Sequence, residues 1–295
     1  MRGAHPEREL ERSIERNGVI ARGERVLIAC SGGPDSIALA AALRAVAEPM
    51  KLVLRVAFIN HGLRASAWQD ECVVLQVAAQ LEISPDVVAL RAEAADEQGL
   101  RTARYDALID LAGRRECSVV ATAHHAEDQS ETVLLALLRG TGPAGLRGMR
   151  ARRPLAPGLD VARPFLEIPS EALRGYCHMR VLPYAVDPTN AQTSLRRNAV
   201  REALSALRPL FPGLDAAVAR AAELIADERS ASPRAELRRC VRAELEREDD
   251  LREIDFQHVE AAVRALEDGR TGTFHMKPGI ALRIERGTIA GITKE

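Results

Sequence analysis

Aromatic residues are scarce: Phe, Trp and Tyr make up only 3% of the 295 residues. Packing must therefore rest on aliphatic side chains, and a hydrophobic content of 46% is enough for a full globular core. No apolar run approaches the ~20 residues that a membrane-spanning helix needs. Residues 1–16 are charged throughout and lack the apolar centre of a signal peptide. We therefore expect a soluble, cytoplasmic protein with no membrane segment.

Paired cysteines are also lacking. The five cysteines are scattered, and no two of them form a Cys-x-x-Cys motif. This pattern is typical of reduced thiols and provides no ligand set for zinc or an iron–sulfur cluster. The net charge is only −1, which neither favours nor excludes a nucleic-acid partner, because such a partner needs a local basic face.

Short apolar runs alternate with longer amphipathic stretches through the first two-thirds of the chain. The runs typical of buried strands lie at 26–30, 52–59, 87–90 and 119–123. The stretches typical of helices lie at 36–47, 66–81, 100–114 and 128–138. This alternation predicts an α/β fold, a parallel sheet with helices on both faces, with ligands bound beyond the carboxyl ends of the strands.

The pattern changes near residue 140. Segment 140–158 is rich in Gly and Pro, which predicts a long loop, and Pro209, Pro212 and Gly213 mark a boundary. We predict a catalytic domain at 1–212 and a small, mainly helical domain at 213–295. The last part of that domain, 271–292, has the pattern of a β-hairpin pair.

A phosphate-binding loop follows the first predicted strand. Its six residues are Ser31, Gly32, Gly33, Pro34, Asp35 and Ser36. Adjacent glycines allow the backbone to approach an anion, and the helix that follows offers free N–H groups. Pro34 suits the first helical turn. No Walker A lysine is present, and the alternative is a Ser/Gly turn that only caps the helix.

Charged clusters follow the other predicted strands and helices. They are Asn60-His61-Gly62-Leu63-Arg64, Arg101 to Tyr105, His124 to Thr132, Asp187 to Asn190, and Arg196 to Arg201. Asp128 and Glu131 are three residues apart, so on a helix both project toward one face. A zinc site at the His124-His125 pair lacks further ligands at suitable spacing. Alternatively, Asp128 and Glu131 lie on a solvated helix face, the arginines at 196–201 start a solvated basic helix, and Arg104 anchors a structural ion pair.

The loop at 31–36 resembles the Ser-Gly-Gly-x-Asp-Ser PP-loop of the N-type ATP pyrophosphatases. Together with the clusters, in this order, it resembles the tRNA(Ile)-lysidine synthetase family, well over about 24–212 and loosely beyond. Two positions depart from the family pattern: Glu127 and Asn60 each stand where Asp is usual.

The resemblance implies a set of site residues. The loop would grip the β- and γ-phosphates of ATP, with Asp35 next to Mg2+ and His61 among the nucleotide-binding residues. His124, Asp128 and Glu131 would bind lysine. Arg104 and Arg197 would stabilise negative charge on the α-phosphate. His61 alternatively only shapes its loop, and any Arg of 196–201 could replace Arg197 in this role.

The resemblance also implies the reaction and its partners. The wobble cytidine of an isoleucine tRNA with a CAU anticodon would be adenylated, and the ε-amine of L-lysine would then displace AMP to give lysidine. Between Thr132 and Leu159 there is no acidic residue. The arginines of this segment are expected either to contact tRNA phosphates or to belong to a solvated loop: Arg139, Arg147, Arg150, Arg152 and Arg153. The C-terminal domain is expected to help recognise the tRNA, and a homodimer is left open.

Two other functions are compatible with the same loop. A PP-loop tRNA thiolase would share the adenylation step, although the lack of a Cys-x-x-Cys motif counts against it. A non-enzymatic ATP-binding module of related fold would not need the cluster from His124 to Thr132.

Overall fold

The computed structural model describes residues 9–60, 67–90, 97–141, 143–185, 195–228, 233–248, 256–277 and 279–294. The chain divides into two compact units, Met1–Arg220 and Ala221–Glu295. The division falls inside helix α9 (Leu214–Glu228), somewhat beyond the boundary expected at 212.

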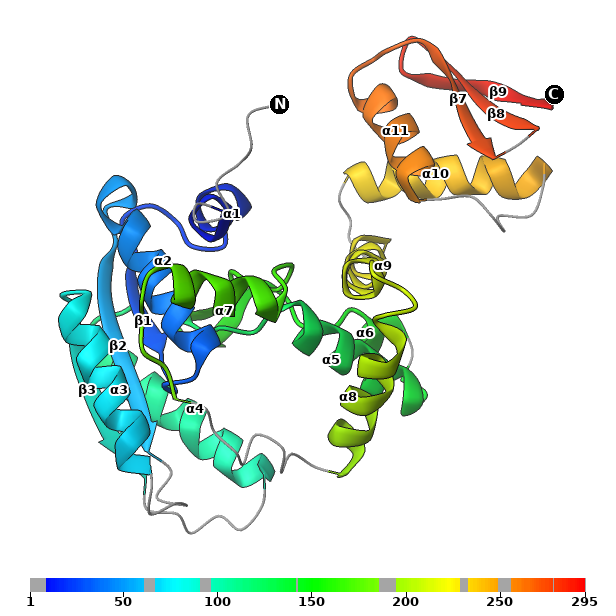
Figure 1. The fold of residues 1–295 in the computed structure, drawn as a ribbon. Helices are drawn as coiled ribbons and strands as arrows, with labels where there is room; N and C mark the ends of the chain where they lie inside the picture. Colours follow the sequence, from blue (N-terminus) through cyan, green and yellow to red (C-terminus); the bar gives the residue numbers. More distant parts are fainter. Residues whose placement is uncertain are drawn as a thin grey trace. The chain divides into compact units, whose positions relative to one another are not determined.

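A six-stranded sheet with the order β3-β2-β1-β4-β6-β5 forms the centre of the first unit (Figure 1). The five parallel strands are β1 (Arg25–Ala29), β2 (Val53–Asn60), β3 (Ser84–Ala89), β4 (Val119–Ala121) and β6 (Leu159–Ala162). The edge strand β5 (Arg152–Ala156) pairs antiparallel with β6. The predicted α/β fold with a mostly parallel sheet is confirmed.

Helices cover both faces of this sheet, because side chains along a strand point alternately to opposite faces. Val26 and Ile28 of β1 belong to one hydrophobic cluster, whereas Leu27 between them belongs to another. The first cluster includes α1 (Glu9–Asn17), α2 (Pro34–Met50), α3 (Ala67–Gln80) and α7 (Ser170–Met179). The second cluster includes α4 (Glu97–Arg114). No helix in the described ranges is long and apolar enough to cross a membrane.

The long loop predicted at 140–158 is wrong in part. The segment contains a short helix, α6 (Pro143–Leu146), and strand β5. Strand β6, which was not predicted, begins at the end of this segment and pairs with β4 from Val119↔Asp160 to Ala121↔Ala162. Such pairing over about 40 residues supplies hydrogen bonds that a Gly- and Pro-rich composition does not reveal.

Strands β1 and β4 lie side by side at the point where the strand order reverses. In open α/β sheets this switch point is where ligands bind, beyond the carboxyl ends of the strands. Helix α2 follows β1, and helix α5 (Ala126–Leu138) follows β4. The topology therefore brings the loop at 31–36 and the cluster from His124 to Thr132 to the same edge.

The second unit is a small helical layer on an antiparallel sheet. Helices α10 (Pro233–Glu248) and α11 (Phe256–Glu267) share a hydrophobic cluster with β7 (Gly272–Lys277), β8 (Ile280–Glu285) and β9 (Thr288–Lys294). The three strands form two consecutive hairpins, in agreement with the predicted hairpin pair.

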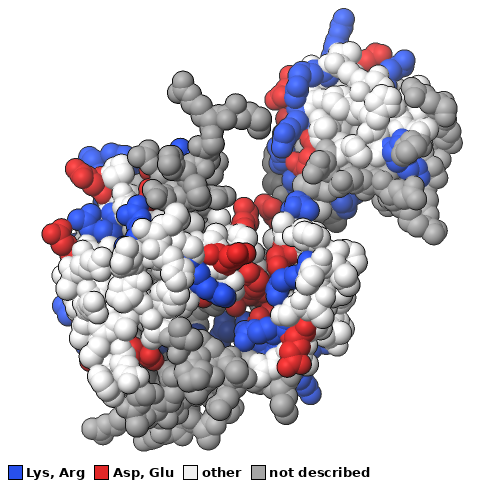
Figure 2. Space-filling view, viewed as in Figure 1, with Lys and Arg blue, Asp and Glu red and all other residues white. Residues whose placement is uncertain are grey.

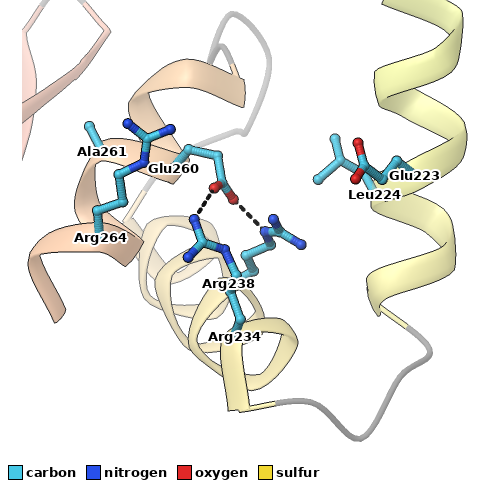
Figure 3. A pocket seen from close by; sticks show the side chains of 7 residues that line it. All are labelled: Glu223, Leu224, Arg234, Arg238, Glu260, Ala261 and Arg264. Atoms are coloured by element: carbon cyan, nitrogen blue, oxygen red, sulfur yellow. Dashed lines mark hydrogen bonds and ion pairs between the residues drawn. The ribbon is translucent and has the colours of Figure 1, made fainter. Parts of the chain in front are cut away.

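A cavity of about 670 Å³ in the second unit is lined by charged side chains (Figure 3). Glu260 accepts a hydrogen bond from Arg234 at 2.7 Å and another from Arg238. Arg238 and Glu260 are both buried. Removing one partner of a buried ion pair would leave an uncompensated charge. We therefore interpret the ion pairs of Glu260 with Arg234 and Arg238 as structural contacts between α10 and α11.

Candidate active site

The loop at 31–36 is held in shape by Ser36. The Ser36 hydroxyl accepts a hydrogen bond from Ser31 N at 3.1 Å and donates one to Gly33 O at 2.9 Å. Gly32 has a φ of +88°, and a Cβ there would lie 3.1 Å from Asp70 O, so glycine is required at this turn. Gly33 is the N-cap of α2 and Pro34 occupies its first turn. The loop is thus preformed at a helix N-terminus, the usual setting for an anion.

Asp35 stands in the first turn of α2 beside this loop. Its Oδ1 atom is buried and has no hydrogen-bond partner among the described residues. Burial raises the pKa of Asp35; the nearby His125 opposes this, and the carboxylate of Asp128 adds to it. A buried, unpaired carboxylate oxygen next to an anion-binding loop fits a magnesium ion, which typically binds one or two carboxylates together with substrate phosphates.

His125 joins the phosphate loop to the cluster on α5. Its Nε2 lies 3.7 Å from Asp35 Oδ2 and 3.5 Å from Asp128 Oδ2, and its Nδ1 lies 2.9 Å from Glu127 Oε2. Burial alone would lower the pKa of His125, but Glu127, Asp128 and Asp35 together raise it above the ordinary value of 6.5. The site residues predicted from the sequence include His124 but not its neighbour His125. The signal was the position of His125 immediately before α5, where an N-cap is expected.

The raised pKa of His125 predicts a pH dependence of stability. A folded-state pKa above the unfolded value contributes stability that is fully present below about pH 6.5 and is lost as the pH rises through the raised value. The free energy of unfolding should therefore be higher for the wild-type protein than for His125→Gln, and this difference should be larger at pH 6 than at pH 9. Urea unfolding at both pH values measures it, with His178→Gln as the control. An advantage of the same size at both pH values would contradict this role.

Glu127, one of the departures from the family pattern, ties α5 to α7. Its carboxylate accepts hydrogen bonds from Ser170 N at 3.0 and 3.1 Å and from Ser170 Oγ at 2.9 Å. Ser170 is the first residue of α7. Burial alone would raise the pKa of Glu127, but His125 and the Ser170 N–H lower it to about 2. The carboxylate therefore stays ionised and stabilises the N-terminus of α7.

Glu131 brings helix α8 (Leu195–Leu207) to α5. Its carboxylate accepts hydrogen bonds from Arg197 Nε at 3.0 Å and from Arg201 Nε at 2.7 Å. The Glu131 side chain is only 4% exposed. Arg197 Nη2 also lies 3.9 Å from Asp128 Oδ1. The clusters at 124–132 and 196–201 are thus in direct contact, and the carboxylate of Glu131 is paired with two guanidinium groups.

A basic side of the site surrounds His124. The pKa of His124 is lowered to about 3, mainly by burial. The nearby positive charges lower it further, in the order Arg163, Arg104, Arg101 and Arg197. The imidazole is therefore neutral, with Nδ1 2.9 Å from Thr122 Oγ1. Figure 2 shows both acidic and basic side chains lining a hollow in the first unit. Arg163, which sequence reasoning missed, directly follows β6 at the same edge of the sheet.

Gln129 clamps the segment after α6 to α5. Its Oε1 accepts from Met149 N at 2.8 Å and its Nε2 donates to Met149 O at 3.0 Å. Arg163 holds the same segment through N–H to Ala151 O at 2.7 Å and Nη1 to Arg150 O at 2.8 Å. These side-chain hydrogen bonds therefore hold part of the segment that its composition predicted to be a long loop.

Arg152 does not fit the expected tRNA-contacting role. It donates to Asp160 Oδ2 at 2.7 Å and to Glu24 Oε1 at 2.8 Å. Its charge is thus neutralised within the fold, by one acid beyond the acid-free segment and another far upstream. His61 and the cluster from Asp187 to Asn190 lie outside the described residues.

Gly148 offers a direct test of the clamp. It has a φ of +61°, and a Cβ there would lie 2.7 Å from Gln129 Oε1. Gly148→Ala should lower the free energy of unfolding by about 1–3 kcal/mol, from left-handed backbone strain and displacement of Gln129. Gly113→Ala on α4, where a Cβ meets nothing within 4 Å, is the matched control and should stabilise by roughly 0.5 kcal/mol. Equal effects in urea unfolding would argue against a tight clamp.

Known proteins resemble this chain over most of its length. A tRNA(Ile)-lysidine synthase of Salinispora arenicola is 40% identical over 213 residues, which cover 70% of this chain and 63% of that protein. A tRNA(Ile)-lysidine synthase of Geobacter sulfurreducens is 32% identical over 301 residues, which cover 88% of this chain and 63% of that protein. These relatives confirm the resemblance that the motifs predict, and the chain spans somewhat less than two-thirds of their length.

A solved structure and a family model agree with the fold. The U34-tRNA thiolase NcsA from Methanococcus maripaludis has a TM-score of 0.65 to this chain at 18% identity, covering 77% of this chain and 79% of that one. At this identity the likeness concerns the fold alone. Residues 4–207, more than half of the chain, match the family model described as the PP-loop domain. The chain therefore belongs to the PP-loop domain family, which uses ATP.

Proposed function

We propose that the protein adenylates the wobble cytidine of an isoleucine tRNA with a CAU anticodon and couples L-lysine to it, forming lysidine. One observation carries the proposal: His125 lies within 3.7 Å of both Asp35 beside the phosphate loop and Asp128 on α5. A module that only bound ATP would need the loop but not this second cluster. The relatives named tRNA(Ile)-lysidine synthase support the choice of reaction.

The phosphate loop would hold the β- and γ-phosphates of ATP. Gly32 and Gly33 leave room for the phosphates, and the free N–H groups at the start of α2 face an anion there. Ser31 and Ser36 keep the loop closed, with their Oγ atoms 3.3 Å apart. The unpaired Oδ1 of Asp35 would contact magnesium, which would neutralise charge on the departing pyrophosphate. His61 stays a prediction for the same nucleotide.

The attacked phosphorus would lie toward the basic side of the site. Arg104 and Arg197 are the candidates to stabilise negative charge on the α-phosphate, and both of their charges help to keep the nearby His124 neutral. Adenylation is required because the carbonyl oxygen of cytidine is a poor leaving group, whereas AMP is a good one.

Asp128 is our candidate for the amine of lysine. Its carboxylate is half-buried and lies near His125 and Arg197. The sequence prediction paired Asp128 with Glu131 for this purpose. Since both oxygens of Glu131 accept from Arg197 or Arg201, we propose that Glu131 instead positions these guanidinium groups. His124, also predicted to contact lysine, stays a candidate.

The partners of the reaction are tRNA, ATP and L-lysine. The C-terminal domain is proposed to assist tRNA recognition, and a homodimer stays a prediction. The test is release of pyrophosphate from ATP on addition of tRNA lacking lysidine. Release that depends on that tRNA supports an adenylating enzyme, whereas the same slow turnover with and without tRNA would favour an ATP-binding module.

A further inference from the structure

Arg163 is a buried cation that has no counter-ion among the described residues. The residue is only 3% exposed, and its Nε has no hydrogen-bond partner among the described residues. Its hydrogen bonds go to neutral groups, the Arg150 carbonyl at 2.8 Å and Tyr105. Burial lowers the pKa of Arg163. Burying an unpaired guanidinium costs several kcal/mol, and two neutral hydrogen bonds do not require a charge.

Two further guanidinium groups, those of Arg101 and Arg104, act on the same Tyr105 and have no carboxylate partner in the described part of the chain. Arg101 and Arg104 stand in the first turns of α4, each with Cζ 5.7 Å from the centre of the Tyr105 ring. Burial lowers the pKa of Arg104. Tyr105 raises this pKa, and the charge of Arg101 lowers it. Within the described ranges, no carboxylate forms an ion pair with Arg101, Arg104 or Arg163. The charge of Arg101 instead disfavours the charged forms of Arg104 and Arg163, so an anion bound among these side chains would be favoured.

We propose that Arg101, Arg104 and Arg163 form a second phosphate subsite, distinct from the loop at 31–36, with Arg163 as its buried anchor. The ligand is a phosphate ester with an ionised oxygen. The position of Arg163 is fixed by the segment that Gln129 clamps, so the subsite is tied to α5 as well as α4. The N-terminal end of α4 adds a favourable dipole. The inference rests on the proposed function only for the origin of the ester, ATP or RNA.

Two sources can supply this ester. One is the α-phosphate of the nucleotide, and the other is a phosphodiester of the RNA strand next to the target base. Guanidinium groups bind both through charge-assisted hydrogen bonds of about 1.5–3 kcal/mol each, which corresponds to roughly a tenfold to hundredfold change in affinity. The sources differ in salt dependence, because a phosphodiester contact on a single strand contributes about 0.7 to the slope of log K against log salt.

The test compares three probes on the full-length chain: magnesium pyrophosphate, AMP and a five-nucleotide RNA. Arg163→Gln should weaken AMP or RNA binding by about tenfold to hundredfold, while pyrophosphate affinity changes less than about threefold. A loss confined to AMP identifies the α-phosphate, and a loss confined to RNA with a shallower salt slope identifies the phosphodiester. Loss of both means that the two esters share the subsite.

Controls keep the outcome interpretable. Arg101→Gln, at an exposed position, should weaken the same probe, and it serves if Arg163→Gln unfolds. Arg114→Gln makes the same charge change at the far end of α4, where Arg114 pairs with Asp110, and should leave every probe unaffected. Unchanged AMP and RNA affinity in both test variants, or an equal loss of pyrophosphate, overturns the subsite. The binding assays need no lysine, so failure of the proposed reaction would be seen separately.

Discussion

Asp35→Asn is expected to slow tRNA-dependent pyrophosphate release by at least about 100-fold, the scale of losing one major electrostatic contact in a site. The Oδ1 atom of Asp35 is buried with no hydrogen-bond partner among the described residues, and the side chain stands at the N-terminus of α2 beside the phosphate loop. Asparagine keeps the shape and removes the charge that would hold magnesium. Folding should be preserved, because the described hydrogen bonds that shape the loop are made by Ser31, Gly33 and Ser36.

Pyrophosphate release measured at saturating ATP and tRNA gives the result. Asp110→Asn is the control, since it makes the same chemical change at an exposed carboxylate on α4 and should leave the rate unchanged. The magnesium requirement should rise in Asp35→Asn alone. If the variant releases pyrophosphate at the parent rate, Asp35 has no part in activating ATP.

Asp128→Asn should raise the lysine concentration needed for half-maximal product by about tenfold to hundredfold, while adenylated tRNA still forms. Asp128 lies beside His125 and Arg197 in the candidate active site, and its carboxylate can form an ion pair with the ammonium group of lysine. Glu131→Gln should behave differently. It weakens the hold on Arg197 and Arg201, so both adenylate formation and lysine use should fall.

Single-turnover reactions separate these effects, with lysine first omitted and then added at rising concentration. Adenylate that accumulates in Asp128→Asn and disappears only at high lysine is the expected result. Should Glu131→Gln form adenylate normally and need more lysine, the amine site includes Glu131, as the sequence alone predicted. An unchanged lysine requirement in Asp128→Asn would move the amine site elsewhere.

The sequence predicted what depends on local pattern. The strands ending at Ala29 and Ala121 are short buried runs, and the helices after them begin with residues suited to an N-terminus. Because parallel strands end at one edge, the sequence predicted that the loop and the α5 cluster share that edge. The structure added that β1 and β4 are neighbours. Strand β6 was not predicted, because a four-residue strand after a Gly-rich segment is too short to show a hydrophobic periodicity.

What the sequence could not predict depends on distant partners. Arg152 lies in a stretch of sequence without acidic residues, yet it forms an ion pair with Glu24, 128 positions away. Glu131 looked like one of two carboxylates available to an amine, until Arg201 paired with it from 70 positions away. Glu127 looked like a weakened motif position, although it caps α7. Arg163 carried one usable signal, an arginine directly after a buried strand.

The most direct test of the proposed reaction is incubation of the protein with ATP, labelled L-lysine and bulk tRNA lacking lysidine. We expect lysine to be incorporated into one isoleucine tRNA, at its wobble cytidine. Incorporation should depend on ATP and should be abolished when the CAU anticodon is changed. Release of pyrophosphate with no incorporation of lysine under the same conditions would contradict it.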